Sequence, residues 1–198
     1  MKYKVLYAEA NYGQPEIDAV VKVLENQRHN MVASTNVTEF QEKIATLFGK
    51  SFGVMSNSGS SANLLALAAF GFEKGKNVIT PALTFSTTVA PIVQCGLIPN
   101  FVDCKIDTLQ IDEDAIEGKI NGDTIAIMVP NLIGNLPDWR RIRKIADKHN
   151  LVVIEDSADT VGYEIEGVLG NPYTDVVTTS FYASHIITGA GVGGMPCF

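Results

Sequence analysis

Three segments of the chain contain residue types that could bind a charged ligand or transfer a proton. Residues 56–63 are a run of small residues, mostly serines, around a glycine. Glu155 and Asp156 are adjacent carboxylates, and His185 lies between a serine and an isoleucine. Backbone N–H groups at a helix start bind phosphate, and a carboxylate that ends a buried strand can pair with a protonated pyridine nitrogen. An imidazole can act as a general acid or base near neutral pH. These segments are therefore candidate parts of a ligand site.

Each segment also has a simpler explanation, which the residues alone leave open. A serine-rich turn is an ordinary helix cap, acidic residues at a strand end can cap a helix or bind a metal, and a lone histidine is commonly a surface residue. Residues 56–63 lack the lysine of a Walker loop, which argues against nucleoside triphosphate hydrolysis. Residues 189–194 fit G-x-G-x-x-G, but the sequence has no helix and acidic residue after them, so we reject dinucleotide binding.

The elements that would position these segments alternate between helices and strands. Apolar residues at helical spacing predict helices over 15–24 and 37–48, and an Ala- and Leu-rich stretch predicts another over 60–72. Apolar runs rich in β-branched residues predict buried strands at 78–81, 98–102, 125–129, 151–154 and 176–181, with a short strand at 53–55. Segments 87–94 and 139–149 can supply crossover helices. We expect an α/β protein with a mostly parallel central sheet flanked by helices.

The order of strands and polar segments indicates where the site should lie. In a parallel sheet, ligands bind at the carboxyl ends of the strands. Small and polar residues directly follow the predicted strands, at 57–61, 84–87, 131–135, 155–159 and 180–185. We therefore expect these five segments to meet at one edge of the sheet.

Composition excludes several classes of protein. The 198 residues are enough for one large domain, and 46% hydrophobic residues are enough for a core. Because 22 acidic residues outnumber 15 basic ones, we expect neither a nucleic-acid nor an anionic-membrane surface. No apolar stretch approaches the ~20 residues of a membrane span, and no signal core follows residues 1–4. Cys95, Cys104 and Cys197 match neither a disulfide framework nor zinc-ligand or iron–sulfur cluster spacing, and the participation of a cluster, as in some relatives of the family named below, stays open. We expect a cytoplasmic protein without a metal.

Five motifs follow one another in an order that resembles a known family. Residues 58–65 read SGSSANLL, 80–85 read TPALTF, 101–103 read FVD, 155–156 read ED and 180–182 read SFY. In this order they resemble the DegT/DnrJ/EryC1/StrS sugar aminotransferase family, whose members are fold-type-I pyridoxal phosphate (PLP) enzymes acting on nucleotide-linked keto sugars. The resemblance runs across essentially all 198 residues. It implies that residues 1–198 are the PLP-binding large domain, without the family's C-terminal small domain.

Carried over by position, the resemblance implies roles for five residues at the cofactor. Gly59 and Ser60 would hold the cofactor phosphate, and Ser180 would add a hydroxyl to it. Phe85 would stack on the pyridine ring. Asp156 would pair with the ring nitrogen.

Two positions depart from the aminotransferase pattern. Asp159 stands where many aminotransferases carry a glutamine near the 3-oxygen of the cofactor. His185 stands five residues after Ser180, where they carry the Schiff-base lysine, and no lysine follows Lys148. An imidazole cannot form a stable internal aldimine, so His185 can serve only as an acid or base. This histidine is characteristic of the family's sugar 3-dehydratases, and the chain most resembles their GDP-4-keto-6-deoxy-mannose 3-dehydratase branch.

The resemblance implies an enzyme of deoxysugar and polysaccharide biosynthesis that removes the C3 hydroxyl of a nucleotide-linked 4-keto-6-deoxyhexose. Pyridoxamine phosphate (PMP) would be held non-covalently, glutamate would be the amino donor, and the enzyme would be a homodimer. Two alternatives stay open: an aminotransferase of the same family with its lysine replaced, and a catalytically silent protein that binds nucleotide sugars. The retention of Phe85, Asp156 and Ser180 argues against the silent protein.

Overall fold

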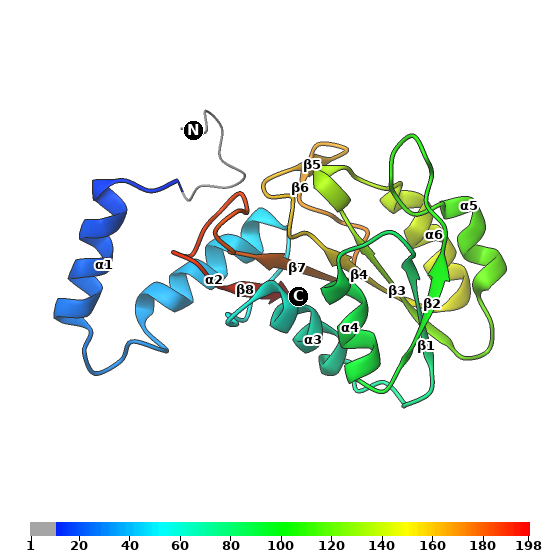
Figure 1. Ribbon diagram of the computed structural model, residues 1–198, viewed down its shortest axis with the longest axis horizontal. Coiled ribbons are helices and arrows are strands. Elements are labelled where there is room, and N and C mark those ends of the chain that lie inside the picture. Colours follow the sequence, from blue (N-terminus) through cyan, green and yellow to red (C-terminus); the bar gives the residue numbers. More distant parts are fainter. Residues whose placement is uncertain (1–10) are drawn as a thin grey trace, which may run out of the picture.

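The computed structural model describes residues 11–198, so the expectation about a signal segment at residues 1–10 lies outside the described residues. One six-stranded sheet has the order β2-β1-β3-β4-β7-β8 (Figure 1). Its strands are β1 (Asn77–Pro81), β2 (Ile98–Val102), β3 (Thr124–Pro130), β4 (Val152–Asp156), β7 (Val176–Ser180) and β8 (Gly194–Cys197). The first five strands pair in parallel, and β8 alone in this sheet is antiparallel. The predicted α/β class with a mostly parallel sheet is confirmed.

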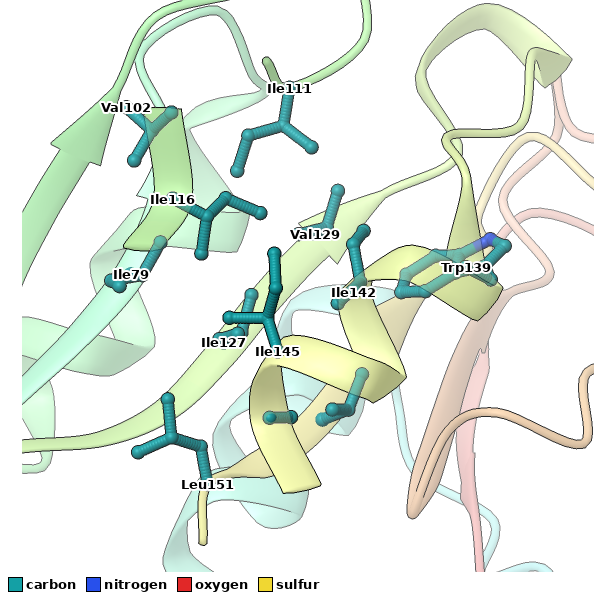
Figure 2. Packing of buried hydrophobic residues seen from close by; sticks show 12 residues of the cluster. Ile79, Val102, Ile111, Ile116, Ile127, Val129, Trp139, Ile142, Ile145 and Leu151 are labelled. Carbon is teal, nitrogen blue, oxygen red and sulfur yellow. The ribbon is translucent and has the colours of Figure 1, made fainter. Parts of the chain in front are cut away.

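Helices cover both faces of the sheet, which gives three layers. One face carries α3 (Gly59–Ala69) and α4 (Ser86–Gln94). The other carries α2 (Thr35–Leu47), α5 (Glu113–Ile116) and α6 (Trp139–His149), and Figure 2 shows the side chains of α6 packed against those of the sheet. Helix α1 (Gln14–Asn26) has no buried residue and lies apart from the sheet (Figure 1).

Successive residues of the central strands pack on opposite faces of the sheet. In β3, Ala126 and Met128 pack with α3 and α4, whereas Ile127 and Val129 pack with α5 and α6. This explains why the strands read as continuous apolar runs. Burial of each such side chain contributes about 1.5–3 kcal/mol to folding. Asp156 shares the face of Ile154, toward α3 and α4, and Glu155 faces the opposite way.

The structure corrects three details of the expected elements. Strand β2 is not buried on both faces, because it is the edge strand, and Ile98 is 55% exposed. The predicted strand at 53–55 makes only isolated bridges, such as Gly53 to Cys197 beside β8. The helix predicted over 60–72 ends at Ala69, and Gly71 follows in the left-handed region with φ +59°.

Several short elements lie where the sequence predicted none. The hairpin of β5 (Glu164–Ile165) and β6 (Val168–Leu169) follows β4, and 3-10 turns η1 (Glu117–Lys119) and η2 (Leu132–Gly134) flank β3. The glycine run at 189–194 leads into strand β8 and not into a helix, which agrees with the rejection of a dinucleotide fingerprint. No helix in residues 11–198 is both long and apolar enough to cross a membrane.

Candidate functional site

The segments that follow the strands meet at the carboxyl edge of the sheet, as the sequence predicted. Asp156, at the end of β4, is hydrogen-bonded to α3 and α4. Ser58, at the start of α3, forms a bridge with Gly193, and His185 lies beside Asp159. Residues that are far apart in the sequence therefore surround one region.

Asp156 is a buried carboxylate held from one side. Asn63 of α3 and Thr88 of α4 each donate a hydrogen bond of 2.9 Å to its Oδ2 atom. Burial raises the pKa of Asp156 above its usual value, and the two hydrogen bonds oppose that shift. Both side-chain donors reach Oδ2, and the backbone amide of Ala158 also hydrogen-bonds the carboxylate, so Oδ1 has no side-chain donor among the described residues and can face a ligand cation.

In the turn before α3, the main chain of Ser58 lies very close to that of Gly194. Ser58 is the N-cap of α3, and its hydroxyl accepts a hydrogen bond of 3.1 Å from the Ser61 amide. The amides of Gly59 and Ser60 belong to the first turn, where a helix offers no acceptor. A Cβ on Gly194 would lie 2.3 Å from the Ser58 carbonyl carbon, so only glycine fits there. Two amides at a positive helix end can bind a phosphate.

Ser180 lies against the start of α3, and Phe85 directly precedes α4. A Cβ on Gly59 would lie 2.7 Å from Cβ of Ser180, so the missing side chain brings the end of β7 directly against the start of α3. The Ser180 hydroxyl accepts a hydrogen bond of 3.3 Å from the Tyr182 amide, which leaves its own proton available for a ligand. Phe85 caps α4, three residues before Thr88, and its side chain is 69% exposed. Such a ring is free to stack on a planar ligand.

His185 and Asp159 lie side by side. Nε2 of His185 lies 4.0 Å from Oδ1 of Asp159. The other carboxylate oxygen of Asp159 accepts a hydrogen bond of 3.1 Å from the amide of Ile133. The Nδ1 atom of His185 is buried and has no hydrogen-bond partner among residues 11–198, while the side chain as a whole is 23% exposed. The structure thus places Asp159 next to the histidine, a relationship that the sequence did not predict.

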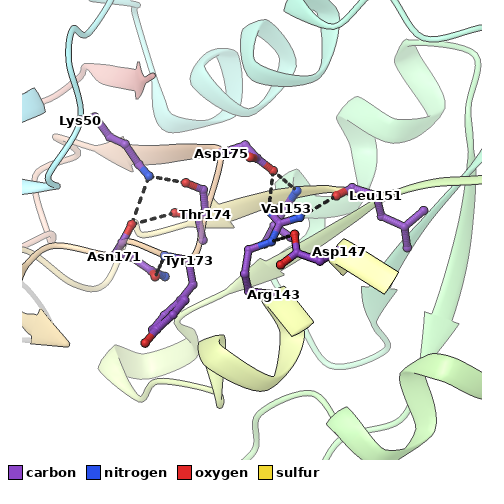
Figure 3. A network of polar contacts seen from close by, with 9 residues as sticks. All are labelled: Lys50, Arg143, Asp147, Leu151, Val153, Asn171, Tyr173, Thr174 and Asp175. Carbon is purple, nitrogen blue, oxygen red and sulfur yellow. Dashed lines mark hydrogen bonds and ion pairs between the residues drawn. The ribbon is translucent and has the colours of Figure 1, made fainter. Parts of the chain in front are cut away.

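No lysine occupies this site in the described chain. Lys50 is half-buried elsewhere, and this burial lowers the pKa of its ammonium group. Its Nζ atom donates hydrogen bonds to the carbonyl oxygens of Asn171, at 3.1 Å, and of Thr174 (Figure 3). Because those carbonyls follow β6, Lys50 stabilises the segment before β7 and does not approach the carboxyl edge.

The sequence analysis missed two residues of the site. Asn63 and Thr88 bind Asp156, and Asn63 also accepts a hydrogen bond of 2.5 Å from the hydroxyl of Thr178 in β7. The signal for Asn63 was a polar residue within an otherwise apolar stretch of Ala and Leu, since such a residue is rarely buried without a partner. Thr88 carries no comparable signal, because threonine is common on buried helix faces.

The geometry fits a phosphorylated pyridine ring. The start of α3 and Ser180 offer donors for a phosphate, and Asp156 offers one carboxylate oxygen for a cation. Phe85 offers an exposed ring, and His185 offers a nitrogen for proton transfer. These residues can hold such a group without a covalent bond to the protein.

Comparisons with known proteins identify the family of this chain. The model of the DegT/DnrJ/EryC1/StrS aminotransferase family matches residues 11–198. The lipopolysaccharide biosynthesis protein RfbH of Salmonella typhimurium is 42% identical over 163 residues, which cover 78% of this chain and 37% of that protein. The GDP-4-keto-6-deoxy-D-mannose 3-dehydratase of Yersinia pseudotuberculosis is 35% identical over 191 residues, which cover 93% of this chain and 48% of that protein.

Relatives with a different reaction are also similar. A GDP-perosamine synthase of Caulobacter vibrioides is 36% identical over 80% of this chain and 43% of its own length. Among solved structures, E. coli GDP-4-keto-6-deoxy-D-mannose-3-dehydratase with bound hydrated PLP has a TM-score of 0.87 and 31% identity. That match covers 96% of this chain and 50% of the other. The chain therefore spans about half or less of the length of these relatives.

Proposed function

Because the chain belongs to the DegT/DnrJ/EryC1/StrS aminotransferase family, we propose that it is a PMP-dependent 3-dehydratase of a nucleotide-linked 4-keto-6-deoxyhexose. A similar solved structure carries hydrated PLP, and several relatives are named for reactions of nucleotide-linked sugars. The observation that supports dehydration is His185, an imidazole at the position where the family's aminotransferases carry their Schiff-base lysine.

Each site residue has one task in this proposal. The amides of Gly59 and Ser60 and the hydroxyl of Ser180 bind the phosphate. Asp156 keeps a proton on the ring nitrogen, since a carboxylate this deeply buried requires a positive partner. Phe85 covers the ring and excludes water. PMP, when bound, supplies an amine for the sugar's 4-keto group and a ring that accepts electrons.

His185 carries the proton transfers. Its imidazole would take a proton from the C4′ carbon of bound PMP and would return a proton to the departing C3 hydroxyl. Oδ1 of Asp159 lies 4.0 Å from Nε2, so a carboxylate stands next to this imidazole. A lysine in this place would bind the cofactor covalently, whereas histidine leaves it free. Glutamate is the proposed amino donor that restores PMP, and the proposed assembly is a homodimer.

The second candidate is a sugar aminotransferase, which the similarity to a GDP-perosamine synthase favours. The two reactions differ in where the nitrogen goes. Removal of the C3 hydroxyl reduces the sugar by two electrons, which glutamate supplies as it becomes 2-oxoglutarate, and the nitrogen leaves as ammonia. Transamination leaves the nitrogen on the sugar.

The test is to incubate the purified protein with PLP, ¹⁵N-glutamate and a nucleotide-linked 4-keto-6-deoxyhexose. We expect a 3-deoxy-4-keto sugar without label and one labelled ammonia for each sugar formed. A ¹⁵N-amino sugar that keeps its C3 hydroxyl would support the aminotransferase and contradict the dehydratase. Binding of PMP without any product would support the silent protein.

A further inference from the structure

Asn131, the first residue after β3, has a buried side chain that contacts residues next to the candidate site. It is 1% exposed. Its backbone amide donates a hydrogen bond of 2.9 Å to the carbonyl of Asp156, and its Oδ1 accepts one of 3.0 Å from the indole of Trp139. No task in the proposed reaction uses Asn131, so its contacts need a separate explanation.

The side-chain amide of Asn131 holds the segment after β4. Nδ2 lies 3.0 Å from the hydroxyl of Thr160 and 3.2 Å from that of Ser157, and both hydroxyls are buried. Ser157 and Thr160 flank Asp159 in the sequence, and Asp156 directly precedes Ser157. Asn63 and Thr88 reach Asp156 from the opposite face of the sheet, so Asn131 fixes the main chain from the side that they leave open.

The turn that begins at Asn131 also reaches Asp159 directly. Ile133 has φ +55°, which is unusual for a β-branched residue, and in this conformation its amide donates to Oδ2 of Asp159. Asp159 is the residue that faces His185. Asn131 therefore contacts the supports of both carboxylates, Asp156 through its backbone and Asp159 through the turn that follows.

A buried carboxylate anchors Asn131 from behind. Nδ2 of Asn131 lies 2.7 Å from Oε1 of Glu155, and the hydroxyl of Tyr163 donates to the same oxygen. The side-chain amide of Asn171 donates a hydrogen bond of 2.7 Å to Oε2 of Glu155. A fully buried carboxylate is tolerated only when donors surround it. Glu155 thus restrains the Asn131 amide, which in turn restrains residues 157–160.

We propose that Asn131 is a positioning residue that sets the places of Asp156 and Asp159 in the cofactor site. This inference rests on the proposed function only in that the site binds PMP. Asn131 touches neither the cofactor nor the sugar in this proposal. It acts by orienting the two carboxylates before any ligand binds.

The test uses three variants of the purified protein and two measurements that require no turnover. Asn131→Ala removes the amide, and Thr160→Val removes the hydroxyl on the other side of the same contact without changing side-chain shape. Tyr163→Phe is the control, because it removes another donor to Glu155 while leaving Asn131's own contacts in place. The measurements are the Kd for PMP and the amide hydrogen exchange of residues 156–160 without cofactor.

We expect Asn131→Ala to raise the Kd for PMP at least tenfold and Thr160→Val to raise it several-fold. Both should speed exchange at residues 156–160. The double variant should bind PMP no more weakly than Asn131→Ala alone, because both changes cut one contact. Tyr163→Phe should lower the melting temperature yet leave the Kd within about twofold and the exchange of 156–160 unchanged.

Equal effects of Asn131→Ala and Tyr163→Phe on Kd and on exchange would overturn the proposal, since they would indicate a general loss of stability. If Asn131→Ala does not fold, the test rests on Thr160→Val. This variant must then raise the Kd for PMP and the exchange rate of residues 156–160 more than Tyr163→Phe does, or the proposal fails. A wild-type protein that does not bind PMP contradicts the proposed function instead, and the exchange measurement still decides the role of Asn131.

Discussion

The side-chain amide of Asn63 donates a hydrogen bond of 2.9 Å to Oδ2 of Asp156, and the two residues are 93 positions apart in the sequence. Asn63 lies in the first turns of α3, the helix whose start is the candidate phosphate site. The hydrogen bond therefore connects the residue proposed for the ring nitrogen to the element proposed for the phosphate. A rigid ligand that spans both would find their separation already set.

In this arrangement the buried carboxylate of Asp156 has no ion pair with any of residues 11–198. Asp156→Asn removes the charge and keeps an oxygen that can accept from Asn63 and Thr88. We expect the cofactor-free variant to be more stable than the wild type by about 0.5–2 kcal/mol, as is common where function conflicts with stability. We also expect its Kd for PMP to rise roughly 30-fold or more, because the ring's cation loses a buried partner. Urea unfolding measures the stability, and PMP titration measures the Kd. A variant with unchanged stability and an unchanged Kd for PMP would contradict the proposal that Asp156 pairs with the ring nitrogen.

The pH dependence of stability follows from the same burial. Burial raises the pKa of both Asp156 and Glu155, so the folded state binds more protons than the unfolded state above pH ~4. The free energy of unfolding of the cofactor-free protein therefore falls as pH rises through the raised pKa values. Asp156→Asn should show a shallower fall, because one of the two groups no longer titrates. Melting temperatures between pH 4 and 9 test this, and identical slopes for variant and wild type would refute it.

Gly59 is proposed to admit both the phosphate and Ser180. Gly59→Ala places a Cβ 2.7 Å from Cβ of Ser180, and the resulting shift should cost about 1–3 kcal/mol of stability and weaken PMP binding. Gly118→Ala is the matched control, since a Cβ at Gly118 meets nothing within 4 Å, and it should change stability by less than ~0.5 kcal/mol. Equal losses in both variants would show that the contact with Ser180 has no special effect.

His185 is the proposed acid and base of the reaction, so its loss should affect rate and not binding. We expect His185→Asn to lower the rate of C3 deoxygenation by about 10²–10⁴-fold while the Kd for PMP stays within about twofold. The variant should also lose exchange of the cofactor's C4′ hydrogen with deuterated water. His29→Asn, which changes an exposed histidine, is the control and should behave as wild type. A large rise in Kd with an unchanged rate would contradict the proposed role.

Much of the fold was predictable because its signals are local. Apolar runs rich in β-branched residues predicted five parallel strands, and the predicted crossover helix at 139–149 matches α6 to the residue. The exposure of β2 was not predictable in the same way. A run of apolar residues predicts burial, but the place of a strand at the edge of a sheet depends on the strand order, which no single segment encodes.

Part of the candidate site could likewise be predicted from the sequence, and part could not. Small residues after strands indicated where Gly59, Asp156 and Ser180 would meet, and the contacts described above agree. The hydrogen bond from Asn63 to Asp156 joins residues with no local relation, so only the folded structure reveals it. The left-handed conformation of Ile133 runs against its local preference and is held by tertiary contacts. For this reason the hydrogen bond from the Ile133 amide to Asp159 could not be inferred from the sequence.

The account depends on a cofactor that histidine leaves unlinked, and one measurement addresses this directly. The protein is incubated with one equivalent of PLP, reduced with borohydride, and examined by intact mass and peptide mapping. We predict no stoichiometric pyridoxyl group on the wild type, because Lys50 is held by two carbonyl oxygens away from the site. The His185→Lys variant, carried in parallel, should be labelled at residue 185. A wild-type protein with one pyridoxyl group on a single lysine would contradict the account.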